Sequence, residues 1–296
     1  MSKDIHIGVQ LGAVVSSGPY ENLKPHFDFQ VTYKDVAEFP GKQFEDDLSK
    51  AEDAQKVAYE RLFKQVEYVE RQAHQKAVEK FHKSIRWYTD EKTGDRWPSV
   101  TSVIDFANPI DWFVSKERLR GLAARGQVVD IVLQEFIKTQ IADKDGIGHW
   151  TSADEIPECH RHITIMRDMD YQIEGNLPAF VDKFDVKFVS GHETVINRKD
   201  KYGGQPDAYA TFGDDKAVVL IDLKSFNPDS NGRTRTLKQT AAYAMASKTK
   251  PDKIGIMPIH GKNQQGYSKP IIESDIAKYY KMFLADRKVF TETFGI

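Results

Sequence analysis

The stretch Tyr202–Ser225, YGGQPDAYATFGDDKAVVLIDLKS, predicts two antiparallel strands joined by a polar turn. Its second half is an apolar run typical of a buried strand, yet charged residues interrupt the hairpin at Asp207, Asp222 and Lys224. Ionised side chains are costly to bury unless a partner compensates their charge. These three residues are therefore the first candidates for a functional site.

The spacing of the two aspartates predicts that they face each other. If Asp214 and Asp215 form a two-residue turn, Asp207 lies directly opposite Asp222, whereas a one-residue slip would put them on opposite faces. Opposed residues have Cβ atoms about 4.5–5.5 Å apart. Two carboxylates at that separation repel each other unless a cation lies between them, and Mg²⁺ prefers oxygen ligands. The hairpin therefore predicts a divalent-metal site.

Lys224 extends the predicted site along the same strand. It follows Asp222 by two residues, so both side chains leave the same face. An ammonium group there can orient an attacking water and offset charge on a reacting phosphorus. Glu193, in GHETVI, adds a third carboxylate on the strand expected just before the hairpin. The alternate residues of the second hairpin strand are apolar and are expected to face a core: Val219, Ile221 and Leu223.

A helix expected after the hairpin carries a second group of polar residues. Gln239 and Tyr243 are spaced i,i+4 and share one helix face, among alanines that permit close approach to the sheet. An ordinary amphipathic helix is the alternative interpretation of this pair. Between the strand and this pair lie Arg233, Arg235 and Lys238, which we expect to contact phosphates.

Composition sets wider limits. The chain has 296 residues and a net charge of −2, so no overall charge indicates a nucleic-acid partner. Residues 35–60, however, carry eight acidic residues against three lysines, and residues 196–262 carry twelve basic against seven acidic. A local basic field can attract a polyanion. The single Cys159 excludes a disulfide framework and four-cysteine metal sites.

Two domains are expected. Residues 1–90 read as a hairpin, with alternating residues over 5–11 and 27–33, followed by a long helix over 47–85. The polar stretch 88–99 is expected to be a linker, and residues 91–296 the main domain. No apolar run could span a bilayer and no signal-peptide pattern opens the chain, so a cytoplasmic protein is expected.

The main domain is expected to be α/β, with a central mixed sheet flanked by helices. Ser99 or Thr101 is the expected cap of its first helix. Further helices are expected over residues 111–140, on both sides of Gly175, and over 234–250 and 274–294. Strands are expected over residues 185–198 and 253–260, in addition to the hairpin.

Several of these segments resemble the motifs of a known family. GGQPDAY, VVLIDLKS and QTAAYA are similar to motifs of the PD-(D/E)XK nucleases, specifically the RecB-like branch that includes exonucleases of phages and of mitochondrial genome maintenance. WPSVTSVIDFANPIDWF and RGQVVD resemble segments near the start of such domains. The resemblance runs from Trp97 to about Ala246. It implies a restriction-endonuclease-like fold and Mg²⁺- or Mn²⁺-dependent DNA hydrolysis with water as nucleophile, in a phage-type setting within the host cytoplasm.

The resemblance also implies roles for individual residues. Asp207, Asp222 and the Leu223 carbonyl are the implied metal ligands, Lys224 the catalytic lysine, and Glu193 an accessory acid. The chain departs from the family where its metal-binding histidine is replaced by Asp130, a residue type that can also bind Mg²⁺. Gln239 and Tyr243 would contact the DNA or brace the site, and Ser99 and Thr101 are further candidate DNA contacts, beside the basic residues Arg233, Arg235 and Lys238 named above.

Three other functions compete with a DNA exonuclease. An endonuclease or nickase would use the same site, and circular DNA separates it from an exonuclease. A degenerate nuclease fold would only bind DNA or a protein, and Asp130 is the residue that keeps this alternative open. Finally, the acidic N-terminal module could be the main functional part, binding a protein or mimicking DNA. Its expected partners are a single-strand-binding protein, a recombination protein or a second copy of the chain.

Overall fold

A computed structural model of the chain describes residues 3–11, 27–36, 41–109, 115–169, 176–260 and 263–296. The chain divides into two compact units, Met1–Lys83 and Ser84–Ile296. The stretch 88–99 is not a linker but forms, with Trp87, a hairpin of the second unit, β3 (Trp87–Thr89) paired with β4 (Arg96–Pro98). Its turn is closed by Asp90, whose buried carboxylate accepts hydrogen bonds from Lys92 and Arg198.

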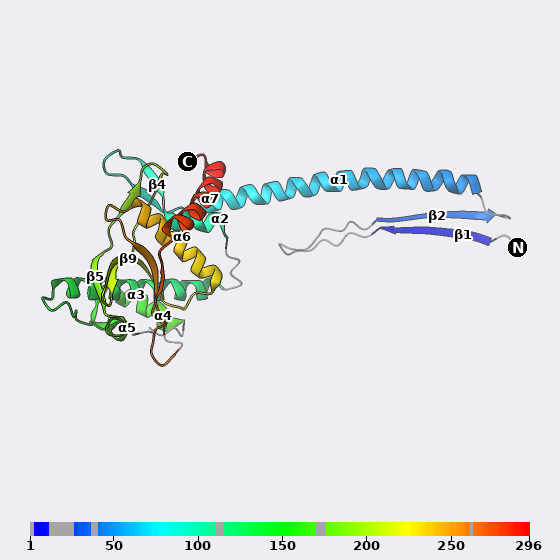
Figure 1. Cartoon of the computed structure of the whole chain (residues 1–296). Coiled ribbons are helices and arrows are strands. Elements are labelled where there is room, and N and C mark those ends of the chain that lie inside the picture. The colour runs from blue at the N-terminus through cyan, green and yellow to red at the C-terminus, as the bar shows by residue number, and fades with distance from the viewer. Residues whose placement is uncertain (1–2, 12–26, 37–40, 110–114, 170–175, 261–262) are drawn as a thin grey trace. The chain divides into compact units, whose positions relative to one another are not determined.

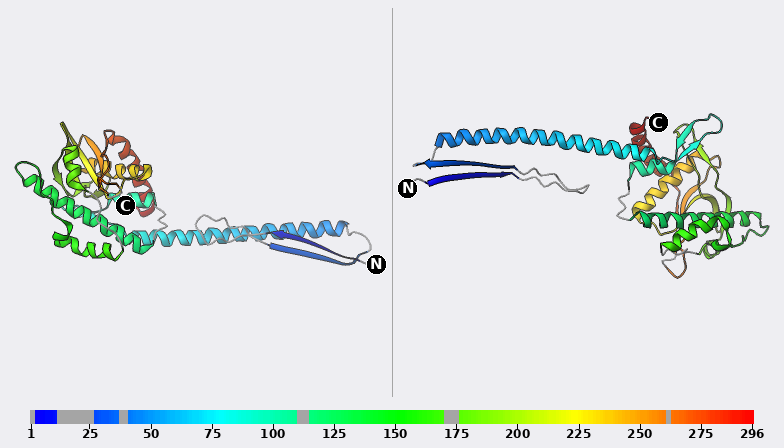
Figure 2. Two further views of the ribbon diagram at one scale, coloured as in Figure 1. Left: turned by 90° about the horizontal axis from the view of Figure 1, so that it is seen from below. Right: turned by 180° about the vertical axis from the view of Figure 1, so that it is seen from behind.

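The first unit contains a hairpin and one long helix, as expected. Strands β1 (Lys3–Leu11) and β2 (Phe27–Val36) are antiparallel, with Val9 opposite Phe29. Helix α1 (Gly41–His82) is continuous over 42 residues and begins six residues before the predicted start (Figure 2). Several large apolar side chains on α1 are exposed within the described chain: Val57, Phe63, Tyr68 and Val69.

The second unit is built on a five-stranded mixed sheet in the order β11-β10-β9-β8-β5. Figure 1 labels β5 and β9 of this sheet among the surrounding helices. Its strands are β5 (Val186–Gly191), β8 (Ala208–Phe212), β9 (Asp215–Lys224), β10 (Lys253–Pro258) and β11 (Ile271–Glu273). Only β9 and β10 pair in parallel among these neighbours. A parallel pair needs a crossover connection, which helix α6 (Ser230–Ala246) supplies. The end of the central strand β9, at Lys224, is therefore where the chain leaves the sheet to form this crossover.

Helices flank the sheet. Helices α3 (Lys116–Ala142) and α5 (Leu177–Phe184) share one apolar core with the sheet residues Ala208, Val219 and Ile221. Alternate sheet residues meet α6 instead, where Tyr209 donates its hydroxyl hydrogen bond to Ser247 at the C-cap. The remaining elements are α2 (Val100–Ala107), η1 (Ala153–Glu155), α4 (Pro157–Asp168), β6 (Val195–Asn197), β7 (Tyr202–Gly204) and α7 (Ile276–Phe294).

The hairpin register is confirmed next to the aspartates but not at the turn. Ala208 pairs with Ile221 and Ala210 with Val219, in the predicted register. Phe212 pairs with Asp215, however, so the turn residues are Gly213 and Asp214, and a register shift separates the two regions. Gly213 has φ +56°, the left-handed conformation that hairpin turns require and that aspartate adopts less readily.

Two predictions next to the hairpin are wrong in detail. The strand expected over residues 185–198 is two strands, β5 and β6, because the backbone turns at His192 with φ +51°. Glu193 therefore lies between strands and is exposed. Helix α6 begins at Ser230, before the predicted start at residue 234, so Arg233 lies within the helix; Asp229 caps it by accepting the Gly232 N–H.

The other predicted helices agree with the structure where it describes them. Ser99 is the N-cap of α2, confirming one of the two expected caps, and its side chain accepts from Ser102 N. Residues 111–114 and Gly175 lie outside the described part of the chain. No helix of the described residues combines the length and apolar character needed to cross a membrane.

The approach of β7 to α6 gives a stability prediction. A Cβ atom at Gly204 would overlap the buried ring of Tyr243, so Gly204→Ala must displace an aromatic side chain from a packed interface. We expect a loss of about 1–3 kcal/mol in the free energy of unfolding, measured by urea denaturation.

Gly126 provides the matched control for Gly204. It lies within α3, its backbone is not left-handed, and a Cβ there meets nothing within 4 Å. Gly126→Ala should therefore stabilise the protein by about 0.5–1 kcal/mol. Equal effects of the two substitutions would contradict the close approach of β7 to α6.

Candidate active site

The end of β9 brings two opposite charges together. Asp222 is only 2% exposed, and Lys224 Nζ lies 2.5 Å from its Oδ2 atom. Lys224 is therefore the counterion of this buried carboxylate. Asp207, one residue before β8, accepts a 2.6 Å hydrogen bond from Leu223 N–H through Oδ2. The predicted meeting of Asp207, Asp222 and Lys224 is therefore present.

Asp130 joins this cluster from helix α3. Its Oδ1 lies 3.1 Å from His192 Nε2, and both side chains are about one-third exposed. One ligand atom each from Asp130, His192 and Asp207 lies within 4.8 Å of the others, which makes these residues a group able to hold a metal ion. Asp222 lies next to this group. In addition to burial, the charge of Asp222 raises the pKa of Asp207, and the charge of Asp130 raises the pKa of Asp222.

His192 was not among the residues predicted from the sequence, although the neighbouring Glu193 was. The strand expected across this region would have placed Glu193 on the metal-facing side. Instead the turn at His192 places an imidazole in the cluster, and Glu193 is exposed and is not a member of that group. The only available signal was a glycine followed by a residue tolerant of left-handed backbone, in GHE.

Backbone contacts hold the cluster in place. Gln134 Nε2 donates to the Asp207 carbonyl at 3.1 Å, and Gln205 Nε2 donates to the His192 carbonyl at 2.9 Å. The His192 N–H donates to the Asp207 carbonyl at 3.4 Å. A Cβ atom at Gly191 would lie 3.1 Å from that same carbonyl, so glycine permits the tight approach. The site is therefore held by neighbours on α3, on β5 and in the segment between β7 and β8.

The cluster carries unbalanced negative charge. Burial, and then repulsion from Asp222, raise the pKa of Asp207 well above its usual range, against the lowering effect of Lys224. Burial also raises the pKa of Asp222, although Lys224 opposes the shift. Burial by itself would lower the pKa of Lys224, but the charges of Asp222 and Asp207 outweigh it and raise that pKa. These directions describe a site short of one positive charge, which a divalent cation would supply.

Gln239 and Tyr243 brace this site from α6. Gln239 Nε2 donates to Tyr243 Oη at 3.3 Å, and Tyr243 is buried with its ring against Gly204. Burial, followed by the charges of Asp222 and Asp207, raises the Tyr243 pKa, so the hydroxyl stays protonated. Of the two roles expected for this pair, bracing fits the buried tyrosine better than DNA contact.

Some of the other expected DNA contacts bind partners within the protein, and the others have exposed side chains. Arg235 pairs with Asp105 and donates to the Asn108 carbonyl, and the buried Lys238 pairs with Asp286. Lys238 is thus engaged inside the protein, and Arg235, which is partly exposed, has an acidic partner within the same unit. The Ser99 hydroxyl is likewise buried and serves as the α2 cap. Arg233 is exposed and Thr101 partly exposed, so they remain candidate contacts.

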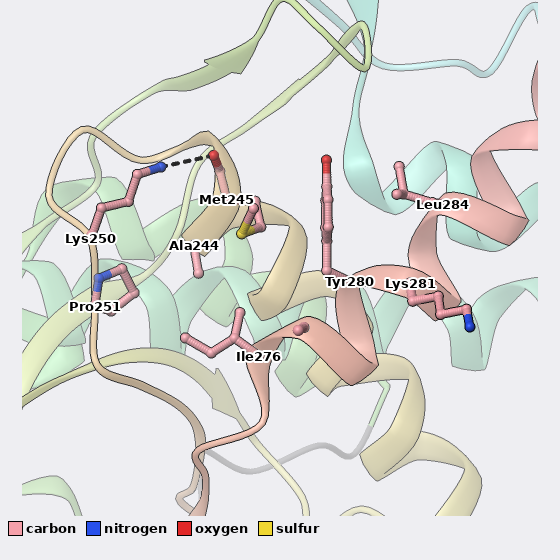
Figure 3. A pocket seen from close by; sticks show the side chains of 9 residues that line it. Ala244, Met245, Lys250, Pro251, Ile276, Tyr280, Lys281 and Leu284 are labelled. Carbon is pink, nitrogen blue, oxygen red and sulfur yellow. Dashed lines mark hydrogen bonds between the residues drawn. The ribbon is translucent and has the colours of Figure 1, made fainter.

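A pocket of about 320 Å³ lies elsewhere, between the end of α6 and the start of α7 (Figure 3). Its walls are mostly apolar, with Lys250 and Lys281 at its edges, and Lys250 donates to the Met245 carbonyl. None of its lining residues belongs to the acidic cluster. The pocket is therefore separate from the candidate active site.

Comparison with known proteins does not assign the site. No protein-family model matches the chain, and no curated protein matches it significantly. The function is therefore inferred from the geometry of the cluster. Its carboxylates, with the buried carboxylate of Asp222 beside them, fit a hard divalent cation such as Mg²⁺ or Mn²⁺.

The electrostatics predict that the site costs stability without metal. Because the pKa values of Asp207 and Asp222 are raised on folding, the folded protein binds these protons more tightly than the unfolded chain. This contribution therefore destabilises the fold as the pH rises above the unfolded pKa of about 3.9. Asp207→Asn removes one charge, and its amide oxygen can still accept from Leu223. At pH 7 in EDTA, we expect calorimetry to show melting about 2–4 °C higher.

The exposed Asp182 on α5 is the control for this charge removal. Asp182→Asn should leave the melting temperature unchanged within about 1 °C, as is usual for surface substitutions. A lower melting temperature for Asp207→Asn alone would show that the carboxylate stabilises the metal-free protein, against this interpretation.

Proposed function

We propose that the chain is a divalent-metal-dependent deoxyribonuclease whose second unit has a restriction-endonuclease-like fold of the PD-(D/E)XK type. The observation that carries the proposal is the convergence of Asp207, Asp222 and Lys224 at the end of the central strand, with Asp130 alongside. The mixed sheet flanked by helices is compatible with that fold. The sequence resemblance is the second line of support.

The residues have separable roles in the proposed reaction. Asp130, Asp207 and Asp222 would hold Mg²⁺ or Mn²⁺, and the Leu223 carbonyl remains a candidate ligand. When bound, such an ion lowers the pKa of a coordinated water and neutralises charge on the phosphate. Lys224 has a raised pKa and stays protonated near neutrality, so it acts as a donor to the attacking water or a phosphate oxygen and not as a general base.

Exonuclease activity is the favoured form of this function, on the basis of the sequence resemblance to phage-type exonucleases. An endonuclease or nickase would use the same residues. The degenerate, binding-only alternative is weakened by the position of Asp130, because this residue lies in the cluster where its carboxylate can act as a ligand. Glu193 is retained only as an exposed acid near the site.

DNA is the proposed substrate, and the N-terminal unit is proposed to engage a further partner. Exposed apolar side chains on α1, together with the acidic character of residues 35–60, support a protein-binding or self-associating role for this unit. A single-strand-binding or recombination protein, or a second copy of the chain, fits that role.

The nuclease proposal predicts degradation of linear DNA that requires Mg²⁺ or Mn²⁺ and leaves covalently closed circles intact. Asp222→Asn should lower the rate at least about 100-fold, because it removes a buried charge from the metal site. Gel and acid-soluble release assays on linear, circular and single-stranded DNA measure both effects. Cleavage of the circles would favour the endonuclease alternative.

Asp215 is the matched control for Asp222, at the opposite end of the same strand. It is exposed and pairs with Lys253. Asp215→Asn should retain wild-type nuclease rates and metal dependence. Equal activity of Asp222→Asn and Asp215→Asn would exclude the proposed site.

Removal of residues 1–83 tests which unit is catalytic. Because the chain divides after Lys83 and all proposed site residues follow it, the remaining unit should keep metal-dependent cleavage. Processivity or self-association, measured by product length and light scattering, should change instead. Loss of cleavage by a shortened chain that circular dichroism shows to be folded would assign an essential role to the N-terminal unit.

A further inference from the structure

We infer that His192 is a nitrogen ligand of the cation held by Asp130 and Asp207, and that this imidazole makes the site prefer Mn²⁺ to Mg²⁺. The inference builds on the proposed function, because it concerns the same metal site. It assigns a role to a residue that neither the sequence motifs nor the family resemblance identified.

The distances fit shared coordination. In an octahedral site with bonds of about 2.1 Å, ligand atoms on adjacent vertices lie about 3.0 Å apart and those on opposite vertices about 4.2 Å. His192 Nε2 and Asp130 Oδ1 are 3.1 Å apart, and the ligand atoms of these residues and Asp207 all lie within 4.8 Å of one another. The upper limit of 4.8 Å exceeds the opposite-vertex separation by about 0.6 Å, so small side-chain movements would let one ion contact all three.

The backbone holds His192 in a costly conformation that aims it at the cluster. Its φ of +51° is one of three positive values among the described non-glycine residues. The Gln205 side chain binds its carbonyl, and its own N–H donates to the Asp207 carbonyl. Left-handed conformations of such residues persist when surrounding contacts enforce them, and they concentrate at functional sites. His192 and Asp207 are thus fixed to each other through the main chain.

The charge balance at the same site also indicates a missing positive charge. Asp222 is 98% buried, and Lys224 Nζ lies 2.5 Å from its Oδ2 atom as its counterion. Asp207 lies beside this pair and accepts from Leu223 N–H, and its charge acts on the same lysine. One ammonium cannot balance two neighbouring carboxylates, and a divalent ion would supply the missing charge. This observation concerns β9, whereas the histidine geometry concerns the β5–β6 connection.

An imidazole changes which metal the site accepts. Carboxylate and water oxygens suit Mg²⁺, Ca²⁺ and Mn²⁺ alike, whereas imidazole nitrogen favours transition metals over Mg²⁺. In the alternative arrangement, His192 donates its N–H to Asp130 and only orients that carboxylate. Direct detection of nitrogen on the metal separates these two arrangements.

The test uses the full-length protein loaded with Mn²⁺. Pulsed electron paramagnetic resonance should detect ¹⁴N coupling to the ion, and labelling of histidine with ¹⁵N should replace it by the ¹⁵N signal. His192→Asn should abolish the coupling, and asparagine tolerates the left-handed backbone at this position. Calorimetry should show Mn²⁺ affinity falling at least about tenfold in this variant, with a smaller change for Mg²⁺. His149→Asn, at a histidine that is 78% exposed, is the matched control and should change neither signal nor affinity.

The outcomes distinguish the two proposals. Mn²⁺ that binds and supports DNA cleavage without nitrogen coupling would overturn the role of His192 and leave the nuclease proposal intact. Equal losses of Mn²⁺ and Mg²⁺ affinity in His192→Asn would overturn the metal preference. Absence of both metal binding and DNA cleavage in the wild-type protein would overturn the nuclease proposal itself. The isotope experiment needs no variant, so its result stands even if His192→Asn fails to fold.

Discussion

The structure of the second unit depends on how it accommodates carboxylates at the end of a buried central strand. Strand β9 alternates between residues that fill the core shared with α3 and α5 and residues that meet α6. Asp222 and Lys224 occupy the latter side, where apolar residues would pack at lower cost. Their neighbours compensate in part, since Leu223 donates to Asp207 and Lys224 approaches Asp222. The fold is thereby less stable than it would be with apolar residues, but it holds several charged groups close together, as is common at functional sites.

Much of this site could be predicted because it follows from strand periodicity. The alternation in VVLIDLK determines which residues face the core, and the register next to Asp207 follows from matching the two strands of the hairpin. The turn differed by one residue because Gly213 alone offers unrestricted positive φ there. The shift between Ala210 and Phe212 absorbed this difference before it could reach the aspartates.

The parts that could not be predicted depend on contacts between distant segments. Arg235 and Lys238 were expected to contact phosphates, and their pairing with Asp105 and Asp286 on other helices left no signal in the sequence. A strand was expected through His192, because a single left-handed residue leaves no periodic signal. The sequence shows which residues are charged, whereas the partner of each charged side chain is evident only in the folded structure.

The position of Lys224 affects how the protein folds before a metal ion is bound. Its side chain acts as a counterion that is covalently attached to the fold, so one carboxylate is already balanced when the chain leaves the ribosome. Small zinc-binding domains lack such an internal substitute and stay unfolded until metal arrives. Here a large core and a built-in ammonium separate assembly from metal loading. The folded protein can therefore exist in an ion-free form that becomes competent when divalent ions are supplied.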